Sequence, residues 1–238
     1  MRWLVACLAL VAFAGCESTQ AKSARLERQA QAAKTEKGVV VTRDAPEIEV
    51  GEAAVLQDAN GAATAVELRN KSGAPLVGLP ISVSVLDAAK KPVYTNDTPG
   101  LDASLVSVPA LAGGERLVWV NDQVTLAGEG KEVTARVGTG GKPGPPELPE
   151  MEITGLKVTT DVGGSATGVG TVHNRSDVLQ RRLVVFVAAR KADRVVAAGR
   201  AIVEQLPAGK SANFTAFLIG DAAGAELSAA APPTIVTP

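Results

Sequence analysis

The sequence predicts an all-β fold made of two consecutive β-sandwiches. From Val39 onward, short runs rich in Val, Ile, Leu and Thr alternate with turns rich in Gly, Pro, Asn and Asp. Residues 81–85 read Ile-Ser-Val-Ser-Val, with an apolar side chain at every second position, which is typical of a strand with one buried face. Aromatic residues form only 3% of the chain, which favours a thin core of small aliphatic side chains.

The first sandwich is expected over residues 39–138 and the second over residues 151–226. Candidate strands in the first cover residues 47–57, 64–69, 81–85, 92–95, 104–108, 116–120 and 133–137. Those in the second cover residues 152–160, 167–173, 183–189, 195–203 and 212–219. Residues 138–149 contain four prolines and four glycines, so we expect a stiff linker over 139–150 that takes no part in a sheet. The last residues, 227–238, are expected to be a disordered tail.

An internal repeat relates the two sandwiches. Asn70-Lys71-Ser72 aligns with Asn174-Arg175-Ser176 at an offset of 104 residues. On the same register, Leu79, Ile81 and Val83 align with Leu183, Val185 and Val187. Further along, residues 111–119 align with 206–214 at an offset of 95. The shorter offset identifies residues 95–105 as an excursion that only the first copy contains.

Both copies therefore read as a strand, an Asn-basic-Ser turn, an alternating strand, and a Leu-x-x-Gly turn before a further strand. The first copy carries this rhythm at 66–72, 83–87 and 111–119, and the second at 170–176 and 206–214. The pattern resembles the FxLYD-type and related immunoglobulin-like sandwich modules of bacterial envelope proteins. Of the Leu-Tyr-Asp signature, the first copy retains Leu86-Asp87 and the second copy nothing. The resemblance implies an immunoglobulin-like fold in the cell envelope, and it implies no ligand or active site.

The N-terminus resembles a bacterial lipoprotein signal peptide, which we expect over residues 1–15. Met1-Arg2 is positive, and residues 3–13 form an apolar run that is shorter than the about 20 residues needed to span a bilayer. The small residues Ala14-Gly15 precede Cys16, although Phe13 stands where Leu is usual. An ordinary secretory signal cut nearby and an uncleaved anchor are the alternatives.

Cysteine usage agrees with lipidation at Cys16. The chain has two cysteines, and Cys7 would leave with the signal peptide, so that the mature chain could form no internal disulfide. A lone exported thiol is reactive, and acylation, for example with palmitate, removes that reactivity. We expect residues 16–38 to comprise the lipid-bearing cysteine and a solvated, partly helical tether. The chain would then be anchored in the cell membrane or outer membrane, facing the periplasm or the cell exterior.

Net charge excludes an obvious nucleic-acid partner. The whole chain carries a formal charge of −1, and loss of residues 1–15 leaves 23 Lys and Arg against 25 Asp and Glu. Basic residues gather locally between Arg175 and Arg200. Protection of strand edges explains this cluster, with an acidic polymer partner as the alternative.

No catalytic constellation, cofactor motif or metal motif emerges from the sequence. His173 is the only histidine, so a zinc site of the usual kind cannot be built, and any Ser-His-Asp arrangement would have to centre on it. We expect His173 to be a half-exposed strand residue, and we expect neither an enzyme nor a bound cofactor.

Four residues are candidates for a binding surface. Asp97 and Asp102 lie in the excursion, and Asp122 follows a strand in which Trp119 sits among apolar residues on both faces. Turn capping by the carboxylates and core packing by Trp119 are the plainer interpretations, since no calcium-loop spacing is present. The alternative is a loop surface at 95–105 and 121–123 used for recognition, with Val118 or Val120 covering an interface between the modules or with a partner.

The expected function is therefore that of a membrane-anchored, extracytoplasmic lipoprotein. It would be a non-catalytic binding, scaffolding or adhesion module whose partners are the membrane, through Cys16, and an unidentified envelope protein or polymer. An accessory or solute-binding lipoprotein of a transport or secretion system is the alternative.

Overall fold

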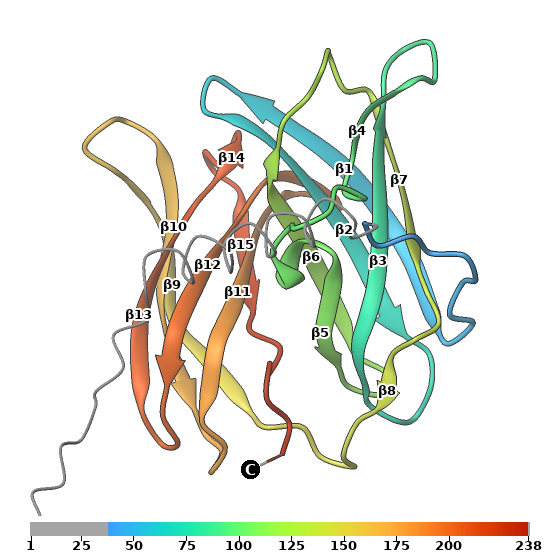
Figure 1. The fold of residues 1–238 in the computed structure, drawn as a ribbon. Coiled ribbons are helices and arrows are strands. Elements are labelled where there is room, and N and C mark those ends of the chain that lie inside the picture. Colours follow the sequence, from blue (N-terminus) through green and yellow to red (C-terminus); the bar gives the residue numbers. More distant parts are fainter. Residues whose placement is uncertain (1–37, 238) are drawn as a thin grey trace, which may run out of the picture. The chain divides into compact units, whose positions relative to one another are not determined.

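The computed structural model describes residues 38–237, and this part of the chain is all-β, with no α-helix (Figure 1). In the N-terminal half the strands are β1 (Ile48–Asp58), β2 (Gly61–Asn70), β3 (Leu76–Leu86), β4 (Pro92–Thr95), β5 (Ser107–Leu111), β6 (Arg116–Val124), β7 (Glu132–Val137) and β8 (Lys142–Pro143). In the C-terminal half they are β9 (Met151–Thr160), β10 (Ala166–Asn174), β11 (Gln180–Lys191), β12 (Arg194–Leu206), β13 (Ser211–Phe217), β14 (Ile219–Gly220) and β15 (Glu226–Ala230). A single 3-10 turn, η1 (Ala103–Leu105), interrupts the first half.

The strands form four open sheets in which every pairing is antiparallel. In the N-terminal half, β1-β2-β6 form one sheet, and β3 pairs with β4, β5, β7 and β8 in the other. In the C-terminal half, β9-β10-β13 form one sheet and β14-β12-β11-β15 the other. The strands of the β1-β2-β6 sheet contact β11 and β12, so the two halves meet through these sheets (Figure 1).

The two halves use the same strand order. The three-stranded sheet β1-β2-β6 corresponds to β9-β10-β13, and β3 lies between β5 and β7 as β11 lies between β12 and β15. The second half has one long strand, β12, where the first half has β4 and β5. The polypeptide between them includes Asp102 and η1, so the excursion predicted from the change of offset breaks that strand in two.

The aligned Asn-basic-Ser turns are held by matching hydrogen bonds. Asn70 Nδ2 donates to the carbonyls of Ala74 (2.8 Å) and Leu111 (3.1 Å), and its Oδ1 accepts from the amide and hydroxyl of Ser72. Asn174 does the same with Val178 (2.8 Å), Leu206 (3.1 Å) and Ser176. Each Asn is buried and ties its turn to the end of a neighbouring strand, which stabilises the crossing between two sheets.

Strand β11 is buried on both faces. Leu183, Val185 and Val187 belong to the core of the C-terminal half. The alternate residues Val184 and Phe186 belong to the large core cluster of the N-terminal half. This explains the uninterrupted apolar run at 183–189, because an antiparallel strand with one face in water would alternate with polar residues. The two halves therefore share buried apolar surface.

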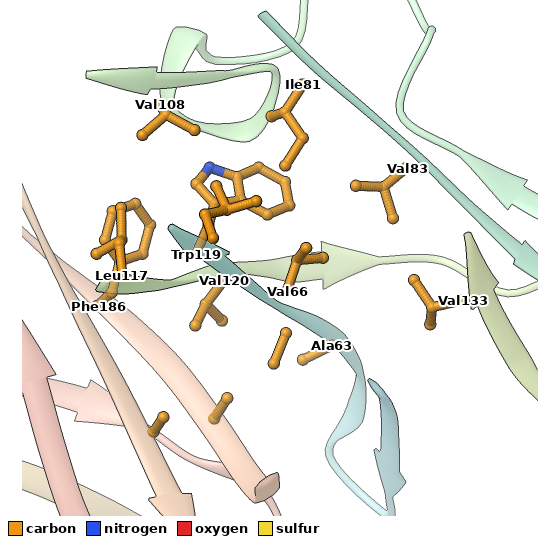
Figure 2. Packing of buried hydrophobic residues seen from close by; sticks show 14 of the residues in the cluster. Ala63, Val66, Ile81, Val83, Val108, Leu117, Trp119, Val120, Val133 and Phe186 are labelled. Atoms are coloured by element: carbon orange, nitrogen blue, oxygen red, sulfur yellow. The ribbon is translucent and has the colours of Figure 1, made fainter. Parts of the chain in front are cut away.

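Strand β6, in the N-terminal half, is likewise buried on both of its faces. Trp119 has no exposed surface, belongs to one buried cluster with Ile81 and Val108, and donates from Nε1 to the Ser107 carbonyl at 3.2 Å (Figure 2). Val120 is also completely buried and lies opposite Ala65 of β2. Alternation along the strand puts Val120 and Asp122 on the face that points away from Trp119 and toward β11 and β12.

Two sequence predictions at the chain connections were wrong in part. The segment expected to be a linker outside any sheet includes β8, whose Lys142 and Pro143 pair with Val77 and Leu76. Proline is tolerated there because its missing amide faces away from the ladder at a sheet edge.

The expected disordered tail likewise contains ordered structure. Strand β15 pairs with β11 from Phe186 to Arg190. Buried Gln180 then holds Thr234 and Ile235, accepting from both amides and donating to the Ile235 carbonyl at 2.9 Å. The Ala- and Pro-rich composition of this segment gave no strand signal, because its order comes from pairing and hydrogen bonds supplied by β11.

Candidate functional site

A buried arginine from the C-terminal half is paired with an aspartate from the N-terminal half. Arg200 of β12 donates from Nε to Asp122 Oδ1 of β6 at 2.6 Å, and its backbone amide lies 3.3 Å from Oδ2. The Arg200 side chain is 3% exposed and that of Asp122 is 19% exposed. A guanidinium is almost never buried without a partner. Burial of this one therefore depends on the two halves lying together.

The excursion extends this pair into a chain of contacts that crosses between the halves. Arg200 Nη1 donates to Ser104 Oγ, and the Ser104 hydroxyl donates in turn to Asp102 Oδ1. Asp102 Oδ2 accepts from Arg182 Nη2 at 2.6 Å, and Arg182 Nη1 lies 3.1 Å from Glu204 Oε1. We call the residues Asp122, Arg200, Ser104, Asp102, Arg182 and Glu204 the Arg200 network. Asp122, Ser104 and Asp102 come from the N-terminal half and Arg200, Arg182 and Glu204 from the C-terminal half, so three contacts of the network cross between the halves.

Charge pairing in the Arg200 network shifts two pKa values. Partial burial acts to raise the pKa of Asp102, but hydrogen bonds from the Ser104 hydroxyl and amide and from Arg182 outweigh it, so the pKa falls below its ordinary value of 3.8. The hydrogen bond from Arg182 to Asp102, together with the Asp102 and Glu204 charges, raises the pKa of the guanidinium. Both groups are thus held in their charged forms.

A second ion cluster joins the halves away from the excursion. Arg190 of β11 pairs with Glu67 of β2 and lies 3.6 Å from Glu52 of β1. The Arg190 side chain is 23% exposed, so this cluster is only partly shielded from water. Asp58 Oδ2 also accepts from the Gly220 amide at 2.9 Å. Apolar side chains also join the halves, since Phe186 of β11 belongs to the same core cluster as Leu117 of β6 (Figure 2).

The structure describes four of the candidate residues, and their contacts differ. Asp102 and Asp122 are brought together through Ser104 and Arg200, but they face the other half of the same chain. Asp97 is exposed and accepts only a local hydrogen bond from Thr95. Trp119 is buried in the core. Two of the carboxylates thus bind within the chain, and the indole does not reach the surface. A recognition role for the loop surface at 95–105 and 121–123 stays a prediction.

Sequence reasoning missed three residues that make this arrangement. Arg200 was considered only as a member of a basic cluster, and its pairing with a carboxylate 78 positions away has no local signal. Ser104 was likewise not singled out. Buried Asn96 anchors the excursion to β3, since its amide group bonds the Val83 amide and the Ile81 and Leu105 carbonyls. The only hint was its place at the start of the extra segment.

A cavity of about 480 Å³ lies beside the Arg200 network, between the halves. Its walls come from β3, β5 and the excursion on one side and from β11 and β12 on the other. Thr234 and Val236 of the C-terminal segment close a further side. This volume lies within the range of about 300–1,000 Å³ that is usual for small-molecule sites.

His173 lies on the outer sheet of the C-terminal half, remote from that cavity in the fold. Its Nδ1 lies 2.6 Å from Ser211 Oγ and its Nε2 lies 2.8 Å from Thr154 Oγ1. These are cross-strand neighbours on β13 and β9, since His173 pairs directly with Ser211. Both ring nitrogens thus face hydroxyls, in place of the carboxylate that orients the base of a Ser-His-Asp triad.

Searches for other sites and for relatives add little. Among residues 38–237, no three His, Cys, Asp or Glu side chains are grouped so that they could hold a metal ion. The same residues include no helix long and apolar enough to cross a membrane. Cys16 lies outside the described residues. No family model and no curated protein sequence matches the chain.

Removal of the Asp122 carboxylate tests the buried pair. We expect Asp122→Ala to lower the free energy of unfolding by about 3–5 kcal/mol, because it leaves the Arg200 charge buried and unpaired. Adding Arg200→Met should restore much of the loss, since the orphaned charge is then gone. Urea denaturation measures both effects. Asp177→Ala, at an exposed carboxylate, is the matched control and should change stability by about 0.5 kcal/mol or less. A similar small effect for Asp122→Ala would contradict the assignment.

Acid titration tests the Asp102 contacts. Because the folded-state pKa of Asp102 lies below 3.8, its ionised form stabilises the fold above that pH. This contribution is lost as the pH falls from about 3.8 through the folded-state value. We expect wild type to lose up to about 1 kcal/mol more than Asp102→Asn as the pH is lowered from about 4 to 2. Asp193→Asn, at an exposed turn carboxylate, should keep the wild-type profile. Parallel profiles for wild type and Asp102→Asn would show that these contacts contribute nothing.

Proposed function

We propose that the chain is a lipid-anchored protein of the bacterial envelope whose β structure is a non-catalytic binding module. The observation that carries the binding role is the cavity between the halves, whose walls are fixed by the Arg200 network. The anchor rests on the apolar run that ends at Cys16 and on the absence of any other cysteine after it. In this proposal the membrane is one partner and an envelope protein or polymer is the other.

The finer fold assignment belongs to the same proposal. We take the two halves to be tandem immunoglobulin-like sandwiches, cut apart at the connection between β8 and β9. The shared strand order and the matching bonds of Asn70 and Asn174 support this. Unlike modules joined only by a flexible linker, these two are packed through β6, β11 and β12. A tether between Cys16 and residue 38 would hold this unit away from the lipid surface.

A non-catalytic role agrees with the position of His173. Its ring lies on a sheet face between two hydroxyls, and general acid–base chemistry would need it beside a substrate pocket. The single carboxylate that lines the cavity between the halves, Asp102, is already paired with the Arg182 guanidinium. Such pairs hold shape and are poor proton donors or acceptors near neutral pH.

The cavity also favours a second candidate, a solute-binding or accessory lipoprotein of a transport or secretion system. Small solutes would occupy the cavity, whereas a scaffolding protein would use its outer strands and loops for another macromolecule. Thermal unfolding in the presence of a panel of small molecules separates the two. A raised midpoint with a solute favours the second candidate. Crosslinking of a macromolecule in intact cells, with no solute effect, favours the first.

Metabolic labelling tests the anchor. Cells expressing the full chain should incorporate labelled palmitate into the wild-type protein and retain it in the membrane fraction. The Cys16→Ala variant should lose both properties, because the lipid-bearing sulfur is absent. Cys7→Ala is the matched control and should be labelled as wild type, since we place Cys7 in the part removed by cleavage. Equal labelling of wild type and Cys16→Ala would overturn the anchor.

A further inference from the structure

The cavity beside the Arg200 network has apolar side chains on both of its sides. Val77 of β3, Pro109 of β5 and Val184 of β11 are among them, together with Ile202 of β12 and Val236. Ile202 is 36% exposed, although it sits on the strand that carries buried Arg200. An apolar group that entered the cavity would cover this surface, and its removal from water would favour binding.

The charged groups around the same cavity are mostly positive. Three cationic side chains line it, those of Lys142, Arg181 and Arg182, against the single carboxylate of Asp102. Asp102 and Glu204 already neutralise Arg182. Among residues 38–237, no carboxylate forms an ion pair with Lys142 or Arg181, and both side chains are exposed. Two cations therefore remain at the cavity for a ligand of opposite charge.

Three residues that line the cavity have a backbone with positive φ. Arg182 has φ of 47°, in the left-handed region that residues other than glycine seldom adopt. Gly78 and Gly140, which also line the cavity, have φ of 66° and 134°. Left-handed non-glycine residues persist where their surroundings hold them, and they concentrate at ligand sites. Here the bonds to Asp102 and Glu204 hold the Arg182 side chain.

We propose that this cavity binds a single-chain amphipathic anion, such as a fatty-acid-like monocarboxylate. Its apolar chain lies against Val184 and Ile202, and its anionic head group is bound by Lys142 and Arg181. Long basic side chains can lay their apolar stems along such a surface and keep their charges in water, which suits both residues to this role. The inference rests on the proposed binding function and names its ligand class. It does not depend on the lipid anchor.

Equilibrium dialysis with labelled dodecanoate, kept below the concentration at which it forms micelles, tests the site. The protein is the chain from residue 16 with Cys16→Ala, which needs no detergent and keeps all of residues 38–237. We expect one saturable site. Dodecyltrimethylammonium, with the same chain and the opposite charge, should bind at least about tenfold more weakly, because it meets Lys142 and Arg181 as like charges.

Variants locate the two ends of the ligand. Lys142→Gln and Arg181→Gln should each weaken dodecanoate binding by about fivefold, the effect of one exposed ion pair. Ile202→Asn should weaken it by about tenfold through loss of apolar contact. Arg194→Gln is the matched control, because Arg194 is an exposed arginine at the start of β12 that does not line the cavity. Unchanged thermal midpoints would show that each variant is folded.

Three results would overturn the proposal. They are no saturable binding of dodecanoate, equal binding of the cationic amphiphile, and binding that the three cavity variants leave unchanged. Binding of an acidic peptide in place of dodecanoate would also contradict the proposal, and would indicate that the cavity binds a protein partner. Because palmitate labelling is measured separately in cells, failure of the ligand leaves the anchor standing, and failure of the anchor leaves the cavity result standing.

Discussion

The structure depends on the burial of one guanidinium. Arg200 is almost fully covered and finds its carboxylate, Asp122, only on the other half of the chain. Removing a charge from water costs several kcal/mol unless a partner and hydrogen bonds replace the solvent. Asp122 and Ser104 supply these only when β6, β12 and the excursion meet. An ion pair of this kind contributes little net stability, but it penalises every other way of placing the two halves.

The excursion at residues 95–105 supplies further contacts to this buried arginine and to Arg182. It breaks the strand that is continuous as β12 in the second half, and the break brings Asp102 and Ser104 toward Arg182 and Arg200. Buried Asn96 attaches the start of the excursion to β3. Contacts within the N-terminal half therefore help to set the position of the excursion. The same residues form part of the cavity wall. One insertion thus both joins the halves and shapes the site that we assign to a ligand.

Local patterns in the sequence were enough to predict the all-β class and the aligned Asn turns. Alternation at 81–85 and the paired motifs at Asn70 and Asn174 are short-range signals, and the bonds they make lie close by or at the expected strand end. The run at 183–189 also carried information, since only a strand buried on both faces is apolar throughout. No local pattern in the sequence indicated the pairing of Asp122 with Arg200 or the strand at 226–230. Each of them forms through contacts between residues that are far apart in the chain. The place of Asp102 and Asp122 in and beside an extra segment was visible in the sequence, whereas their contacts with Arg182 and Arg200 were not.

The two sandwich-like halves form one cooperative unit, held by the Arg200 network and the shared core around Phe186. Differential scanning calorimetry of the chain from residue 16 with Cys16→Ala tests it most directly. We expect a single transition whose calorimetric and van't Hoff enthalpies agree, because neither half can keep its buried surface without the other. Two separable transitions, with the lower one unaffected by Asp122→Ala, would show that the halves are independent domains and would contradict it.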